Sequence, residues 1–184
     1  MTAWLIYESA SGRTSAIAES VGEGLAQSLE VRLIDVQVAP RHIDDVVQVV
    51  VVGAPAHAFA LTRRRRDDAP RPAAAPPSAR AVGVRDWLRT VERCTSDVVV
   101  VAFDTRPKRP RRPGSAARAI RRRLWWKGYR TMASVSFFPE DPHAPTADLE
   151  RERARRWGEH LGQGLTGFDP VVGIERAGGP RRPG

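Results

Sequence analysis

Short runs of β-branched and other apolar residues alternate along this chain with longer stretches in which apolar residues recur every three or four positions. The short runs have the composition of buried strands, and the longer stretches have the periodicity of amphipathic helices. We expect strands near residues 3–7, 30–36, 47–53, 97–103 and 130–138. We expect helices near residues 14–28, 83–93, 115–127 and 147–165. This alternation predicts an α/β protein whose parallel sheet carries helices on both faces.

The first expected strand leads directly into a turn rich in hydroxyl groups. The turn consists of Ser9, Ala10, Ser11, Gly12, Arg13 and Thr14. Backbone N–H groups at the start of the following helix have no partner within that helix, and the helix dipole makes this end positive. Hydroxyl donors and a glycine that allows close backbone approach complete the chemistry of a phosphate cradle. Capping of the helix by Ser11 or Thr14 alone is the alternative.

The turn sequence SASGRT resembles the phosphate-binding loop of flavodoxins, which reads Ser/Thr-x-Thr-Gly-x-Thr directly after the first strand. Ser11 stands where that pattern has its middle threonine, so the hydroxyl is kept. The wider segment from Leu5 to Leu25, LIYESASGRTSAIAESVGEGL, is also similar to a flavodoxin amino terminus, and the resemblance continues in spacing to about Leu165. It implies a doubly wound five-stranded sheet of order 2-1-3-4-5 that binds the phosphate of flavin mononucleotide (FMN) on this turn.

The resemblance also implies that the loop after the third strand lies against the flavin ring. This loop consists of Pro55, Ala56, His57, Ala58 and Phe59. Phe59 or His57 is the candidate for stacking on the isoalloxazine, since each offers a π-face, and a histidine can hydrogen-bond the ring near neutral pH. Packing of Phe59 on the protein core is the alternative.

A third loop, after the fourth strand, is implied to contact the pyrimidine edge of the flavin through main-chain and side-chain groups. It consists of Phe103, Asp104, Thr105 and Arg106. An inward-pointing Arg106 would favour the anionic reduced flavin. Asp104 has the alternative interpretation of a simple turn or cap residue. In sheets of this order the strand-end loops converge on one ligand site, so the three loops are expected to lie together.

Other phosphate-binding and catalytic patterns are absent. The chain has no GxGxxG after the first strand and no GxxxxGK followed by Ser or Thr, which excludes a dinucleotide fingerprint and a P-loop. A phosphorylated receiver domain needs an acceptor Asp at the end of the third strand, where this chain has Gly53. The four histidines lack the spacing of metal ligands, and the single Cys94 has no adjacent catalytic partner. We expect no metal and no catalytic side chain.

The net charge of +9 is concentrated in two segments. Residues 63–85 carry a net +5 and residues 104–123 a net +8, which leaves −4 for the rest of the chain. Both segments follow strands that are expected to rim the cofactor site, so the field there should attract FMN and redox partner proteins with acidic docking surfaces. Arginine-rich loops also favour nonspecific nucleic-acid binding at low salt. No stacking platform or known recognition pattern indicates specific nucleic-acid binding.

The length of 184 residues fits one domain with a substantial core. We expect the domain to span residues 1–167, with a basic, Pro- and Ala-rich insertion at 62–81 and a flexible basic tail at 168–184. The longest apolar runs are far shorter than the roughly 20 residues of a transmembrane helix. The amino terminus lacks a basic region before its apolar run, and one cysteine allows no intramolecular disulfide. We therefore expect a cytoplasmic protein.

These features predict an FMN-binding, flavodoxin-like protein that transfers electrons, with the flavin supplying the chemistry. The first alternative is an FMN-dependent quinone or protoporphyrinogen oxidoreductase, which would share every motif described above. The second alternative is a degenerate domain that has lost FMN and serves in binding or regulation. An electron carrier is favoured over a turnover enzyme because no side chain is needed as a general acid or nucleophile.

Overall fold

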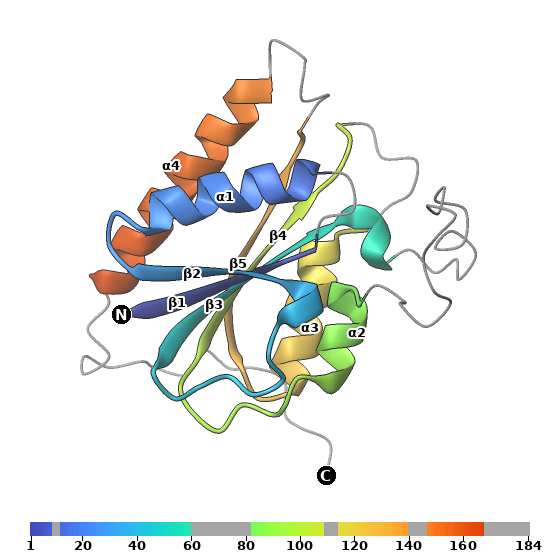
Figure 1. Ribbon diagram of the computed structural model, residues 1–184, viewed down its shortest axis with the longest axis vertical. Coiled ribbons are helices and arrows are strands. Elements are labelled where there is room, and N and C mark those ends of the chain that lie inside the picture. The colour runs from blue at the N-terminus through green and yellow to red at the C-terminus, as the bar shows by residue number, and fades with distance from the viewer. Residues whose placement is uncertain (9–11, 60–81, 109–113, 140–146, 168–184) are drawn as a thin grey trace.

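Five parallel strands form a single sheet in the order β2-β1-β3-β4-β5 (Figure 1). The computed structural model describes residues 1–8, 12–59, 82–108, 114–139 and 147–167. The strands are β1 (Thr2–Tyr7), β2 (Glu30–Asp35), β3 (Val47–Pro55), β4 (Val99–Thr105) and β5 (Arg130–Phe137). The predicted α/β class and the order 2-1-3-4-5 are therefore confirmed. The predicted insertion at 62–81 and tail at 168–184 lie outside the described residues.

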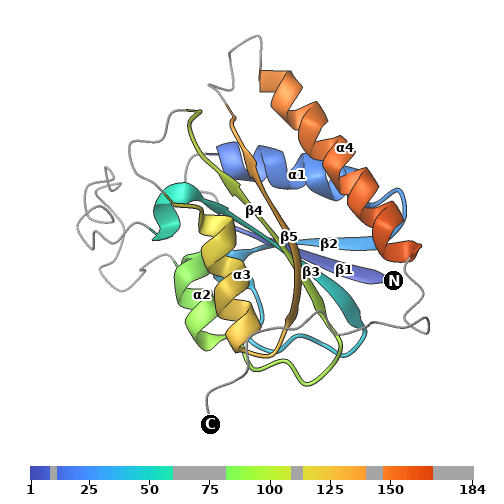
Figure 2. The same ribbon diagram turned by 180° about the vertical axis from the view of Figure 1, so that it is seen from behind.

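Helices cover both faces of the sheet, as the alternation in the sequence predicts (Figures 1 and 2). One face carries α1 (Arg13–Leu25) and α4 (Ala147–Thr166), and the other carries α2 (Val84–Thr90) and α3 (Ala116–Trp126). Two short 3-10 helices, η1 (Val36–Val38) and η2 (Ala56–Phe59), follow β2 and β3. Helix α2 ends earlier than predicted, at Thr90, where β-branched residues disfavour further helix.

The four consecutive valines of β3 show how the sheet divides the core. Val49 and Val51 pack with α1 and α4, whereas Val50 and Val52 pack with α2 and α3. Side chains alternate between the two faces of a strand, so a strand covered on both faces is apolar at every position. Each of these valines is at most 1% exposed. The valine run therefore identifies β3 as the central strand of the sheet.

Helices α1 and α4 approach closely through glycines. A Cβ atom added to Gly24 of α1 would collide with the main-chain carbonyl of Arg155 on α4. A Cβ atom added to Gly158 of α4 would collide with the carbonyl of Val21 on α1. By contrast, nothing lies within 4 Å of the place where a Cβ on Gly164 would sit. The crossing is thus a contact between two backbones, which only residues without a side chain permit.

An exposed ion pair joins the segment before β3 to the segment after α2, and its strength depends on pH because one partner is a histidine. Nδ1 of His42 lies 3.0 Å from Oε2 of Glu92. The hydrogen bond to Glu92 is the largest influence and raises the pKa of His42 above its ordinary value of 6.5. Desolvation opposes this shift, and the charges of Glu92, Asp44 and Asp45 add to it. The charged form of His42 is therefore favoured by folding.

We expect Glu92→Gln to return the pKa of His42 toward 6.5, measured by NMR titration of the imidazole. Because the folded pKa is the higher one, the pair stabilises the protein fully below about pH 6.5, and this contribution is lost as the pH rises through the folded pKa. The change in stability should be small, since both side chains are exposed. An unchanged histidine titration in the variant would contradict the pairing.

Within the described ranges, no helix is both long and apolar enough to cross a membrane. The same part of the chain contains no group of three or more His, Cys, Asp or Glu side chains arranged to hold a metal ion.

Candidate functional site

The strand order creates a point at the carboxyl edge of the sheet, between β1 and β3, where the order of successive strands reverses. Strand β1 lies beside β3, and the helices that follow these two strands cover opposite faces. In doubly wound sheets, ligands bind in the crevice outside the carboxyl ends of the strands at such a point. The ends of β1, β3 and β4 therefore define the candidate site, as the sequence analysis expected.

Helix α1 begins at this edge. Its first turn has no acidic side chain that would neutralise the positive end of the helix dipole. Gly12 is the N-cap residue and has φ 75° and ψ −18°, a left-handed conformation that favours glycine. No side chain of the cap residue accepts a hydrogen bond, and no acidic residue lies in the first turn. Arg13 is exposed beside it. Ser9, Ala10 and Ser11 lie outside the described residues, so their predicted roles remain predictions.

The hydroxyl of Thr14 does not cap α1. Its Oγ1 lies 2.8 Å from Oγ1 of Thr105 at the end of β4, and both side chains are buried. Both threonines are predicted from the sequence to lie at the flavin site, but their contact with each other is not. One hydroxyl hydrogen lies between the two oxygens, which leaves one further hydrogen available to an acceptor. The pair joins the start of α1 to the third predicted loop.

Glu8 holds the first turn to two other elements, a role that the sequence analysis missed. Its backbone N–H donates to the carbonyl of Gly53 at 3.0 Å, and its Oε2 accepts from the backbone N–H of Val84 at 2.7 Å. Val84 begins α2, whose N-cap residue, Gly83, has no side chain to cap it. In the sequence, a glycine at the expected start of a helix indicates that the cap must come from elsewhere. No local pattern identifies Glu8, 76 residues away, as the residue that supplies it.

The second predicted loop is shorter than expected because β3 continues to Pro55. The next four residues form η2, and buried Ala58 packs in the core shared with α2 and α3. Ala56 is half-buried. The side chains of His57 and Phe59 lie outside the described part of the structure, so their stacking on a flavin remains a prediction.

In the third predicted loop, the first three residues belong to β4. Asp104 pairs in register with Ala54, and Thr105 pairs with Pro55. Phe103 is fully buried on the α1 and α4 face, where its ring meets Phe137 edge-to-face at 5.8 Å between centroids. A contact from Phe103 to a ligand at the sheet edge would therefore come from its main chain.

Asp104 caps helix α3. This role agrees with the alternative given for it from the sequence, a turn or cap residue rather than a flavin contact. Its Oδ2 accepts from Ser115 Oγ at 2.6 Å and from the backbone N–H of Ala117 at 3.1 Å. Ser115 Oγ in turn accepts from the backbone N–H of Arg118. The carboxylate is completely buried. A carboxylate at a helix N-terminus interacts favourably with the helix dipole, so Asp104 is well placed as a cap of α3.

Arg106 lies beside Asp104 and points toward the segment that precedes α3. Its Nη1 donates to the carbonyl of Gly114 at 3.3 Å, and its guanidinium lies 5.5 Å from the centre of the Phe138 ring. Its Nε is 3.9 Å from Oδ1 of Asp104. Both of these atoms are buried without a hydrogen-bond partner among the described residues. They are therefore polar groups at the sheet edge with unused hydrogen-bonding capacity.

Known structures support the fold defined by this geometry. No protein-family model matches the chain, and no curated protein matches its sequence. A flavodoxin from the domain Archaea matches with a TM-score of 0.55 and 16% identity over 90% of this chain and 99% of that one. Flavodoxins 1 and 2 of Bacillus cereus each match with a TM-score of 0.58, at 15% and 16% identity, over 89% of this chain and 98% and 99% of theirs.

The strand order and helix placement define a doubly wound α/β protein whose β1–β3 switch point is the candidate ligand site. More particularly, the chain has the flavodoxin-like fold, since nearly the whole length of these flavodoxins superposes on it. The resemblance stated from the sequence is thus confirmed at the level of the fold.

Proposed function

We propose that this protein binds FMN at the switch point and transfers electrons. One observation carries the proposal: α1 begins at the carboxyl ends of β1 and β3 with a left-handed glycine and no acidic side chain in its first turn. Free N–H groups and the positive end of a helix favour a phosphate monoester at that place. The bound flavin would supply the redox chemistry.

The charges near this edge also fit a phosphate. Glu8 directly precedes the first candidate loop and Asp104 lies within the third, and each accepts a hydrogen bond at the N-terminus of a different helix. Their negative charges are thereby offset by helix dipoles. The phosphate turn, Gly12 to Thr14 with the preceding serines, would hold the phosphate, and the segments 55–59 and 103–106 would contact the ring.

The chain's own contribution is to bind and orient the cofactor, and no step requires a side chain as acid or nucleophile. The excess of positive charge supports redox partners with acidic docking surfaces. An FMN-dependent quinone or protoporphyrinogen oxidoreductase would have the same cofactor site and differ by turnover. The cytoplasmic location inferred from the sequence remains a prediction.

The proposal is tested by titrating the purified protein with FMN and, in parallel, with riboflavin. The two ligands share the ring and differ in the phosphate, so we expect saturable one-to-one binding of FMN and at least about ten-fold weaker binding of riboflavin. Flavin fluorescence and the visible spectrum report binding. Salt at about 0.5 M, where the Debye length is below about 5 Å, suppresses nonspecific attraction to basic loops.

The outcomes separate the three functions. Absence of saturable FMN binding would reject the proposal and leave the degenerate binding domain. Turnover of NAD(P)H with a quinone by the FMN-loaded protein would identify the oxidoreductase. Equal affinity for FMN and riboflavin would contradict the phosphate site while leaving a ring site.

The two partnered threonines provide a matched pair of variants. Thr14→Val and Thr105→Val each remove one hydroxyl from the same hydrogen bond, so each should lower the free energy of unfolding by about 1 kcal/mol. Only Thr14 lies in the proposed phosphate turn. We expect Thr14→Val to reduce the preference for FMN over riboflavin about ten-fold and Thr105→Val to leave that ratio unchanged. Equal ratios in both variants would remove Thr14 from the phosphate site.

A further inference from the structure

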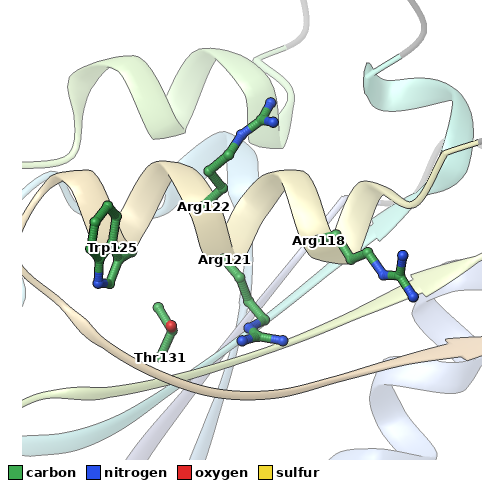
Figure 3. Close-up of a pocket in the computed structure, with 5 residues that line it drawn as sticks. All are labelled: Arg118, Arg121, Arg122, Trp125 and Thr131. Carbon is green, nitrogen blue, oxygen red and sulfur yellow. The ribbon is translucent and has the colours of Figure 1, made fainter. Parts of the chain in front are cut away.

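A basic groove lies between α3 and the edge strand β5, away from the switch point. It encloses a hollow of about 320 Å³ lined by Arg118, Arg121, Arg122, Trp125 and Thr131. Figure 3 shows the side chains of Arg118, Arg121 and Trp125 on the side of α3 that faces β5, and the Arg122 guanidinium directed the other way. Among the described residues, β5 pairs only with β4, so the groove runs along the open edge of the sheet.

Within the described part of the chain, no carboxylate neutralises the positive charge of this groove, unlike that of the other arginine-rich helix. Helix α4 carries four arginines and four carboxylates, and every one of its arginines forms an ion pair within the helix. Hydrogen bonds from Arg155 and Arg156 hold the pKa of Glu152 at about 2, so that carboxylate stays charged. Helix α3 carries four arginines and no carboxylate.

The groove arginines have no acidic partner in the described part of the chain. Arg121 donates through Nη1 to Ser134 Oγ at 3.2 Å, while its buried Nε finds no acceptor among the described residues. Burial, followed by the charges of Arg85, Arg122 and Arg89, lowers the pKa of Arg123 on the same helix. Arg118, Arg121 and Arg122 are therefore cationic groups that have no carboxylate partner among the described residues.

Two indoles are exposed at the end of the same helix. Trp125 is 44% exposed and Trp126 is 61% exposed, and their ring centres lie 4.9 Å apart in an edge-to-face arrangement. Arg118, Arg121 and Trp125 are spaced at i, i+3 and i+7, which places them on one stripe of the helix. No stacking platform was predicted from the sequence, and these two exposed indoles are candidates for one. A cationic stripe that ends in an exposed aromatic ring is the arrangement that binds a backbone of phosphates and a stacked base.

We propose that this groove binds single-stranded nucleic acid, with Arg118 and Arg121 on successive phosphates and a base stacked on Trp125. Carboxylates of an acidic peptide would satisfy the arginines equally well but would leave the indole without a planar partner, so the aromatic end of the stripe favours the nucleic acid. A single strand is favoured over a duplex because its bases are free to stack on protein. The proposal does not depend on FMN binding.

The test uses the full chain and a fluorescein-labelled oligothymidylate of about 15 nucleotides, with binding followed by anisotropy over a range of salt concentrations. We expect Arg118→Gln/Arg121→Gln to weaken binding at least ten-fold and to reduce the slope of log K against log salt by about 1.4, or 0.7 for each lost phosphate contact. The control is Arg151→Gln/Arg156→Gln, which removes the same charge from the neutralised helix α4.

Trp125→Ala tests the stacking half of the proposal, and we expect it to weaken binding about five-fold or more with little change in the salt slope. Thermal unfolding confirms that each variant remains folded. Equal losses in the α3 and α4 double variants would overturn the proposal, because binding would then depend on net charge alone. Binding of polyglutamate or of a duplex of the same length as tightly as the single strand would also overturn it.

Discussion

Gly158→Ala is expected to lower the free energy of unfolding by about 3 kcal/mol or more. The added methyl group would meet the main-chain carbonyl of Val21, and a backbone contact cannot be relieved by a change of rotamer. The helices must separate instead, which opens the core formed by Ile17, Leu25 and Ala154 between them and the sheet. Overpacking of this kind typically costs 1–3 kcal/mol even where side chains can adjust. Chemical denaturation monitored by circular dichroism measures the change.

The matched control is Gly164→Ala on the same helix. No atom lies within 4 Å of the added methyl group there, so only helix propensity changes. Because alanine is favoured over glycine inside a helix by about 1 kcal/mol, this variant should be as stable as the parent protein or more stable. If the two variants had similar stabilities, the close backbone crossing of α1 and α4 would be contradicted.

Removal of the buried carboxylate at the end of β4 should have an effect of similar size. Asp104→Ala is expected to destabilise the protein by about 3–5 kcal/mol, because the carboxylate accepts hydrogen bonds from Ser115 and Ala117 and lies close to Arg106. The first turn of α3 would lose an acceptor and its neighbouring negative charge. Denaturant unfolding gives the magnitude.

The Asp104→Asn variant distinguishes the cap from a flavin contact. Asparagine keeps a side-chain oxygen for the helix N-terminus, so it should recover a large part of the stability lost in the alanine variant. If Asp104 acts only on α3, FMN affinity measured under conditions where the variant is fully folded should match that of the parent. A large affinity loss in a stably folded Asp104→Asn protein would instead place the carboxylate against the flavin.

The fold could be predicted because its signals are local. The four valines of β3 already indicate a strand that is buried on both faces, and the stripe of apolar residues in α1 indicates which side of that helix faces the sheet. Side-chain alternation and helical periodicity depend only on residues a few positions apart. The order of the strands followed from a resemblance at the amino terminus together with this regular alternation.

The details of the candidate site depend on contacts that no local pattern contains. The hydroxyls of Thr14 and Thr105 meet across 91 residues of sequence, and Glu8 reaches the N–H of Val84 across 76. The end of β4 was predicted two residues early because it is set by pairing with Ala54 and Pro55 of β3. Because the strand was predicted to end too early, Phe103, which is a core residue, was assigned to a predicted ligand loop.

Among the described residues, the two arginine-rich helices differ in how their charges are balanced, so the positive charge of α3 and the balanced charges of α4 lie on opposite faces of the sheet. The arginines of α4 are paired with carboxylates of the same helix within a few ångströms, whereas helix α3 has four arginines and no carboxylate of its own. We expect the unbalanced charge of α3 to favour approaches to a highly charged anion in which the α3 face comes first. The molecule would arrive already oriented, with the α1 and α4 face turned away from the anion.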